Sequence, residues 1–412
     1  MDQGGSASRR LIIYTMKTYK ILTLGASGAG KTVFLASMFK SLSIQTEHGF
    51  YLEVEDFTQQ KLLTDIYTNL IAGGIWPEAT KYKEISEWTF TCCVKNRNLE
   101  NFPICQFSYF DYAGGRLTAI DENAHELEAI IRQADAILGL LDGQKIQALM
   151  SNSNEDKKMD NFLKTDLPAL IKWMSHSQAP IQFVVSKWDL LENNFGLQEI
   201  SNRLLKIPEF KKLVFERNRE SSPVRLIPVS SVGFGFATPQ PDGSMKKIAG
   251  SIPRPFHMEV PMSCVIPDLL EKEIQVNLQK LIAISNEKIG EDSEFNKLLN
   301  NFLKAILKFR ILIDMIVDFL VSNYLEEDTD NIQLEIEIKK QIFKQIDNFV
   351  LAKIKKKVEA NDKKITELRQ KRDESIQKIQ DETTAFQSAV TSFLYISNKL
   401  SQDFPDSEII ID

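Results

Sequence analysis

The stretch that decides the predicted fold is Lys20-Ile-Leu-Thr-Leu-Gly-Ala-Ser-Gly-Ala-Gly-Lys-Thr32. Its first five residues are typical of a short buried strand, and residues 33–42 follow with the apolar spacing of a helix. Between them lies G-x-x-x-x-G-K-T, whose glycines let backbone N–H groups wrap phosphate oxygens, while the lysine adds positive charge and the threonine hydroxyl offers a Mg²⁺ ligand. The sequence therefore predicts a loop that binds nucleotide phosphates. Its candidate contacts are Gly25, Ser27, Gly28, Ala29, Gly30, Lys31, Thr32 and Val33.

A second motif stands at the end of a later strand. Residues 104–110 are typical of a buried strand, and Asp111-Tyr-Ala-Gly114 follows at once. An aspartate at a strand end can hold Mg²⁺ through water, and a glycine three positions later lets its N–H approach the terminal phosphate. Asp-x-x-Gly is also an ordinary turn, but downstream of a phosphate loop it favours a nucleotide role for Asp111 and Gly114.

A third motif indicates which base is bound. Residues 180–185 form a nearly continuous apolar run, as expected for a strand covered on both faces, and Ser186-Lys-Trp-Asp189 follows. A carboxylate can accept hydrogen bonds from the N1–H and exocyclic amine of guanine, which adenine does not offer in that arrangement. A further strand at 224–229 leads to a serine turn that can reach the guanine carbonyl. The candidate base contacts are Lys187, Asp189, Ser230 and Ser231.

With these motifs in this order, the chain resembles the TRAFAC class of P-loop GTPases. Within that class it is similar to the Ras-, Arf- and Rag-like small GTPases and to bacterial TRAFAC-clade GTPase domains fused to helical regions. The resemblance covers roughly residues 17–265. It implies an α/β fold, with a Ras-like P-loop NTPase sheet carrying helices on both faces, followed by an all-α C-terminal module. It also implies GTP and GDP as ligands, Mg²⁺ as cofactor, and hydrolysis of the γ-phosphate.

The resemblance also implies a metal-binding threonine in a loop between the first helix and the second strand. Residues 56–74 have the spacing of a helix, and a loop at 75–80 precedes a strand-like run at 88–94. Thr80 is the natural candidate in that loop, although a loop threonine without a metal role is the alternative. The candidate metal ligands are then Thr32, Thr80 and Asp111, and the candidate catalytic residues are Lys31, Thr80 and Arg116.

The chain departs from the family pattern at several positions. Gly115 stands where the small GTPases commonly carry a glutamine that orients water, which predicts slow intrinsic hydrolysis. Arg116 follows, but a guanidinium is always protonated and can assist only electrostatically. Ser27 replaces a common glycine and would crowd an incoming arginine finger. Ser186 replaces the usual Asn or Thr, and Ser231 the usual Ala, yet neither change removes the base-reading carboxylate.

The remainder of the chain is predicted to be mainly helical. From Ile354 a heptad pattern can be counted, but several core positions are polar. Two arrangements therefore stay open, a coiled coil and an antiparallel hairpin that packs on residues 294–325. The predicted regions are an N-terminal extension (1–16), a GTPase domain (17–290) with a proline-rich insert at about 234–263, and a helical module (291–412).

The overall composition of the chain limits the classes of partner and the compartment that we expect. The chain has 50 Lys and Arg against 56 Asp and Glu, a formal net charge of −6, so we expect no nucleic-acid partner. The lysines at 353–357 leave membrane contact open, but acidic residues follow them, which favours a solvated helix face. Four cysteines without a CxxC pair, and an N-terminal stretch without a secretory pattern, are typical of a cytoplasmic protein.

The sequence thus predicts a GTP-binding and GTP-hydrolysing switch whose helical module binds a protein partner, with homo-oligomerisation left open. One alternative is a scaffold that binds GTP tightly and hydrolyses little of it, because Gly115 replaces the glutamine. A dynamin-like membrane or filament GTPase is another, because residues 294–400 are helix-rich and include the lysine cluster.

Overall fold

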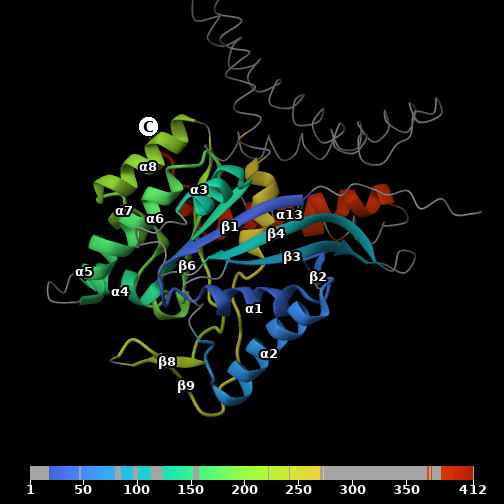
Figure 1. The fold of residues 1–412 in the computed structure, drawn as a ribbon, viewed down its shortest axis with the longest axis horizontal. Helices are drawn as coiled ribbons and strands as arrows, with labels where there is room; N and C mark the ends of the chain where they lie inside the picture. Colours follow the sequence, from blue (N-terminus) through green and yellow to red (C-terminus); the bar gives the residue numbers. More distant parts are fainter. Residues whose placement is uncertain are drawn as a thin grey trace, which may run out of the picture.

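A seven-stranded, mostly parallel sheet flanked by helices forms the body of the protein in the computed structural model (Figure 1). This α/β architecture is compatible with a Rossmann or P-loop-like fold. The residues that the structure describes are 18–45, 48–78, 85–95, 101–112, 124–151, 157–220, 222–240, 242–269, 272, 369–370, 373 and 382–411.

The strands run in the spatial order β2-β3-β4-β1-β5-β6-β7, and β8 and β9 form a separate hairpin. Strands β4, β1, β5, β6 and β7 are mutually parallel, whereas β3 pairs antiparallel with β2 and with β4. The strands are β1 (Thr18–Gly25), β2 (Tyr51–Val54), β3 (Ile85–Val94), β4 (Phe102–Tyr112), β5 (Ala136–Asp142), β6 (Ile181–Ser186), β7 (Val224–Pro228), β8 (Ala237–Pro239) and β9 (Met245–Lys247).

Most connections between the parallel strands contain helices, as parallel strands require. The α-helices are α1 (Lys31–Leu42), α2 (Phe57–Gly73), α3 (Ala124–Gln133), α4 (Gly143–Ser151), α5 (Lys157–Asn161), α6 (Leu167–Met174), α7 (Leu197–Leu204), α8 (Pro208–Arg219) and α13 (Glu382–Asp403). The shorter turns are the π-helical η2 (Phe162–Asp166) and the 3-10 helices η3 (Trp188–Leu190) and η4 (Pro405–Ser407). Residues 260–269 are also helical.

Two apolar layers hold the sheet between the helices. On one face, α1, the 260–269 helix and α13 pack against strand residues such as Ile21 and Phe107. On the other face, α3, α4, α6, α7 and α8 pack against residues such as Leu22 and Phe183. Ile21 and Leu22 are neighbours on β1 and point to opposite layers, as the alternation of a strand dictates. Strands buried on both faces explain the continuous apolar runs in the sequence.

The register places the carboxyl ends of four strands at one edge of the sheet. Thr23 on β1 pairs with Asp111 on β4, Gly25 pairs with Leu140 on β5, and Asp142 pairs with Ser186 on β6. The loops that follow β1, β5 and β6 therefore emerge side by side. In open α/β sheets this edge is where ligands bind.

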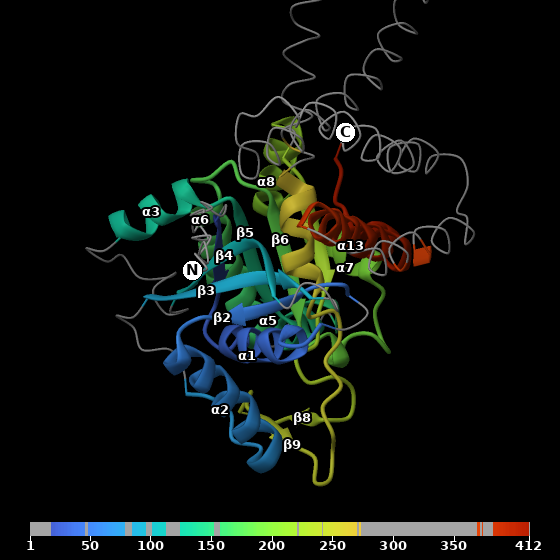
Figure 2. The ribbon, with the colours of Figure 1, turned by 90° about the vertical axis from the view of Figure 1, so that its right-hand side faces the viewer.

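Helix α13 is part of this body, although its residues belong to the region predicted as a separate C-terminal module. It lies along β3 and β4 and beside the 260–269 helix (Figure 2). Phe393 is 1% exposed and its ring centroid lies 4.9 Å from that of Phe50. The heptad positions Ala389, Phe393 and Ile396 are buried, as the pattern predicted, but against the sheet. Residues 294–325, the other candidate packing surface, lie outside the described residues.

The C-terminal segment after α13 extends this contact to the far edge of the sheet. The backbone N–H of Ile409 donates to the carbonyl of Val224 on β7, at 2.9 Å. Arg225 on the same strand forms an ion pair with the buried Asp268, whose other oxygen accepts from Gln182 on β6. Buried charges of this kind are costly unless they are paired, so the pair ties the 260–269 helix to the sheet.

Several local predictions are confirmed and one strand was missed. Helix α2 begins after Asp56, whose side chain caps the N–H of Gln59, and it ends before Gly74, a C-cap residue in the left-handed conformation (φ 65°). The predicted strands around 88–94, 104–110, 180–185 and 224–229 are present. The missed strand is β2, whose four residues are too few to show a period.

All four cysteines are buried, and none forms a disulfide. Of the helices in the described part of the chain, none has both the length and the apolar character needed to cross a bilayer.

Candidate functional site

The loop between β1 and α1 has the shape that its glycines permit. Gly28 and Gly30 both have positive φ, 81° and 87°, a region that residues with a side chain rarely adopt. Gly30 is also the N-cap of α1, so the first N–H groups of the helix face the loop. A Cβ on Gly25 would lie 3.1 Å from the Cβ of Leu140. A helix N-terminus behind a glycine loop is an anion-binding arrangement, because its N–H groups and its dipole both favour negative charge.

Lys31 is the buried cation of this loop. Its side chain is 7% exposed, and its ammonium donates to the carbonyl of Gly25 at 2.8 Å and that of Ala26 at 3.4 Å. Burial lowers the pKa of Lys31, and the nearby Asp111 carboxylate opposes that shift. A buried cation within reach of a loop of N–H groups supplies the charge that phosphate oxygens need.

Asp111 is the matching buried anion at the end of β4. It is 4% exposed, and its Oδ1 has no hydrogen-bond partner among the described residues. Burial raises the pKa of this carboxyl, and the charge of Lys31 opposes the shift. An unpaired buried carboxylate oxygen is costly unless a cation or a water approaches it, so the site fits a hard divalent cation such as Mg²⁺. Thr32, with its hydroxyl one residue beyond Lys31, is a second described residue suited to hold it.

The turn after β6 is tied directly to the phosphate loop. Ser186 is 4% exposed, and its hydroxyl lies 2.9 Å from the carbonyl of Ala29 and 3.1 Å from that of Leu141. The Lys187 ammonium donates to the carbonyl of Gly28 at 3.0 Å. The Ser186 hydroxyl therefore connects the turn after β6 to the phosphate loop.

Lys187 is held in an uncommon conformation. Its φ is 54°, in the left-handed region, and its ammonium lies 2.9 Å from Oδ1 of Asp142 at the end of β5. Gly143 follows Asp142, and a Cβ there would lie 2.4 Å from the carbonyl oxygen of Ser186. The turn after β5 thus forms a close support for the turn after β6, and only glycine leaves room for it.

Asp189 is oriented by a second turn. Its Oδ1 accepts a 2.5 Å hydrogen bond from the hydroxyl of Ser230, which itself accepts from the N–H of Gly233 at 2.8 Å. Burial raises the pKa of Asp189, and the Ser230 hydrogen bond opposes the shift. The N–H of Trp188 donates to Val229 O, so backbone and side chain both join the two turns. The carboxylate keeps Oδ2 as an acceptor for a ligand.

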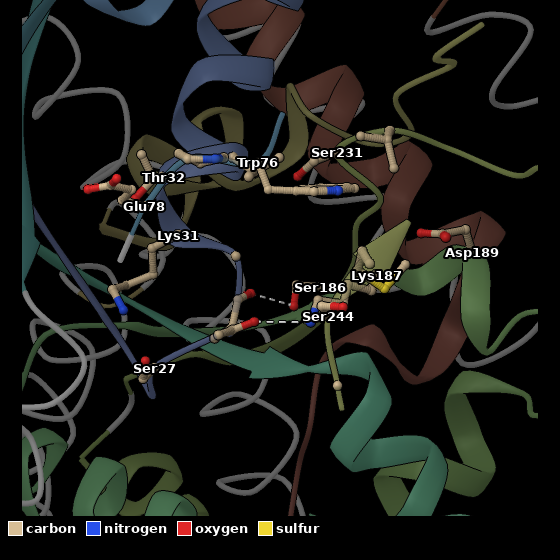
Figure 3. Close-up of a pocket in the computed structure, with 18 residues that line it drawn as sticks. Ser27, Lys31, Thr32, Trp76, Glu78, Ser186, Lys187, Asp189, Ser231 and Ser244 are labelled. Carbon is tan, nitrogen blue, oxygen red and sulfur yellow. Dashed lines mark hydrogen bonds between the residues drawn. The ribbon is translucent and has the colours of Figure 1, made fainter. Parts of the chain in front are cut away.

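These elements enclose one cavity of about 370 Å³, within the size range of small-molecule sites. Figure 3 shows Lys31 and Thr32 at one end and Lys187 and Asp189 at the other. Trp76 lies across the cavity from Ser186 and Lys187, and Glu78 lies beside Thr32. The residues that line the cavity are Ser27, Gly28, Ala29, Gly30, Lys31, Thr32, Val33, Trp76, Pro77, Glu78, Ser186, Lys187, Asp189, Ser231, Val232, Gly243, Ser244 and Met245.

Most of the predicted site residues come together in this cavity. Of the predicted residues that the structure describes, three do not line it. The carbonyl of Gly25 accepts from Lys31, and the charge of Asp111 acts on Lys31. The hydroxyl of Ser230 orients Asp189. Thr80, Gly114 and Arg116 lie outside the described residues, so the predicted second metal ligand and both positions after Asp111 stay predictions.

Several residues of the site were not predicted. Asp142 stands at a strand end, the same signal that identified Asp111, and could have been found that way. Trp76 was recognised only as part of a loop, and its indole N–H is buried without a partner among the described residues. Gly243, Ser244 and Met245 belong to the β8–β9 hairpin, and no local pattern connects that hairpin with the phosphate loop.

Comparison with known proteins assigns no family, since no family model and no curated protein matches the chain. Within the described residues, no group of three or more His, Cys, Asp or Glu side chains is arranged to hold a metal ion.

Proposed function

We propose that this protein binds GTP with Mg²⁺ in the cavity and hydrolyses it, and that the nucleotide state controls a partner-binding C-terminal region. The observation that carries the proposal is that Asp189 and the phosphate loop open into the same cavity. One end offers glycine N–H groups and Lys31 to phosphates, and the other offers an oriented carboxylate to a base. A guanine nucleotide is the ligand class that needs both.

Base selection follows from the hydrogen-bonding capacity of Asp189. Ser230 occupies one lone pair of Oδ1, which leaves the carboxylate free to accept from the N1–H and exocyclic amine of guanine. The Lys187 stem would lie against one face of the base, and its ammonium is already anchored by Gly28 and Asp142. Adenine would leave the buried carboxylate unpaired, which is the basis of strong discrimination.

At the phosphate end, the residues of this chain act by placing charge. Lys31 is now bonded to two carbonyls of its own loop, and phosphate oxygens would take the place of those partners. Thr32 and Asp111 would hold Mg²⁺, which supplies charge neutralisation for the phosphates when bound. Charge that develops on the transferred phosphoryl group is stabilised by the loop N–H groups and Lys31. The product would be GDP and inorganic phosphate, from attack of water on the γ-phosphorus.

Isothermal titration calorimetry with GTP, GDP and ATP in the presence of Mg²⁺ tests the proposal. We expect both guanine nucleotides to bind and ATP to bind at least about a hundredfold more weakly. The absence of heat for GTP and GDP on folded protein, or equal binding of ATP, would contradict it. Single-turnover hydrolysis then separates a switch from a tight-binding scaffold, since a scaffold would bind GTP and leave it intact.

A further inference from the structure

The β8–β9 hairpin is too small to hold its position unaided. It has three residue pairs, Ala237 with Lys247, Thr238 with Lys246 and Pro239 with Met245. An isolated two-stranded hairpin is marginal at best in water. Its place beside α2 and below α1 (Figure 1) must therefore come from contacts with the rest of the protein.

The base of the hairpin is anchored to the first two helices. Phe236 is fully buried with Val33 of α1 and Leu70 of α2. On the other strand, the ammonium of Lys247 donates to the carbonyl of Ile71 near the end of α2 and lies 5.7 Å from the centroid of the Phe236 ring. These contacts fix where the hairpin leaves the body.

Gln144 of α4 anchors the tip of the hairpin. Its Nε2 lies 3.2 Å from the carbonyl oxygen of Gly243 and 3.0 Å from Sδ of Met245. Its Oε1 accepts from the ammonium of Lys158 at 3.1 Å, which orients the amide. Gln144 is 5% exposed, so these bonds form where water does not compete freely.

The residues that Gln144 holds are residues of the cavity wall. Gly243, Ser244 and Met245 line the cavity, whereas Gln144 does not. Figure 3 draws Ser244 on the side of the cavity where Ser186 and Lys187 lie, away from Lys31. The hairpin therefore closes the end of the cavity where the base is proposed to bind.

We propose that the β8–β9 hairpin retains the base of the bound nucleotide and that Gln144 is the residue that positions it. The inference rests on the proposed guanine-nucleotide binding. Because GDP and GTP share the same base, loss of the Gln144 contacts lowers the affinity for GDP and the affinity for GTP by the same factor. A ligand made of phosphates alone does not reach the hairpin side of the cavity, so its affinity is unaffected.

Replacement of Gln144 by leucine tests the inference, because Gln144→Leu keeps a similar volume and removes both hydrogen bonds to the hairpin. We expect tritiated GDP to dissociate about three- to tenfold faster, with an equal loss of affinity for GTP. Binding of inorganic tripolyphosphate, measured by calorimetry, should change less than about twofold. The matched control is Gln198→Leu, the same change at an exposed position of α7, which should leave dissociation unchanged.

Unchanged GDP dissociation in folded Gln144→Leu protein would overturn the inference, and so would equal weakening of GDP and tripolyphosphate. Should Gln144→Leu fail to fold, Met245→Ala removes a wall side chain directly and must itself accelerate GDP release for the inference to stand. Wild-type protein that binds no guanine nucleotide would instead contradict the proposed function, so the two failures are distinguishable.

Discussion

The hydroxyl of Ser230 donates a 2.5 Å hydrogen bond to Oδ1 of Asp189, across 41 positions of sequence. Ser230 is fully buried, and the N–H of Gly233 donates to its oxygen in turn. The hydroxyl is thereby directed at the carboxylate. The two turns after β6 and β7 thus act as one unit at the base end of the cavity.

Replacement of Ser230 by alanine removes this orienting bond. A hydrogen bond to a charged group contributes about 1.5–3 kcal/mol, so we expect Ser230→Ala to weaken GDP binding by roughly ten- to a hundredfold. Calorimetric titration of GDP measures the effect. An affinity equal to that of the wild type would show that Asp189 needs no such orientation.

The Asp189→Asn variant is expected to exchange guanine for xanthine. The amide presents an N–H₂ donor where the carboxylate presented an acceptor, and xanthine carries a carbonyl where guanine carries an amine. Competition between GDP and xanthosine diphosphate for the protein measures the preference. Retention of the wild-type GDP affinity would reject Asp189 as the residue that recognises the base.

As the pH falls, guanine recognition should be lost at a higher pH than it would be if Asp189 had the pKa of an ordinary aspartate. Burial raises the pKa of Asp189, and recognition of the amine needs the ionised form. Recognition is complete above that raised pKa and is lost as the pH falls through it. The ratio of GDP to inosine diphosphate affinity isolates this effect, since inosine lacks the amine while the phosphates are the same. In the Ser230→Ala variant, this loss of guanine recognition should occur at a still higher pH. A ratio of GDP to inosine diphosphate affinity that is independent of pH in both proteins would contradict the prediction.

The Asp111→Asn variant tests the cation role of Asp111. We expect Mg²⁺ to strengthen GTP binding by wild-type protein, and this enhancement to be largely lost in the variant because a neutral amide is a weaker ligand for a hard cation. Titrations with excess Mg²⁺ and with a chelator measure it. Binding in chelator serves as the internal control for folding, and an undiminished Mg²⁺ effect would remove Asp111 from the metal site.

Removal of the Phe393 ring should destabilise the body of the protein. Phe393 is almost fully buried against Phe50, and replacement of such a side chain by alanine costs about 3–5 kcal/mol. Chemical denaturation of Phe393→Ala should show this loss in the main unfolding transition. The control is Phe57→Ala on α2, where the ring is 76% exposed and a change within about 0.5 kcal/mol is expected. A main transition unaffected by Phe393→Ala would mean that α13 does not stabilise the sheet.

The sequence predicts those parts of the site whose residues all lie within one short segment. The phosphate loop and the Lys187–Asp189 turn each follow directly on a strand, so their residue types and spacing suffice. The Asp142–Lys187 pair and the Gln144–Gly243 contact join segments 45 and 99 positions apart. They depend on the order of strands in the sheet and on where the hairpin leaves the body, neither of which a local pattern contains.

The difference between local and long-range information also explains why the heptad pattern of α13 predicted which of its faces is buried but not that α13 packs on the sheet. Apolar residues at heptad spacing indicate which face of a helix is buried, and Ala389, Phe393 and Ile396 are indeed buried. The spacing does not indicate what covers that face. Here it is a sheet whose strands are encoded some three hundred positions earlier, and long-range packing of this kind has no signature in a single segment.

The position of α13 also sets an order of events during synthesis. The strands beneath it, β3 and β4, leave the ribosome well before residues 382–403 have been made, and domains generally begin to fold in that order. Until α13 emerges, the apolar residues around Phe50 and Phe107 that it will cover are without this part of their packing. A nascent chain that already carries a complete phosphate loop would therefore still be exposed to aggregation, and its native state becomes attainable only after residues 382–403 have been made.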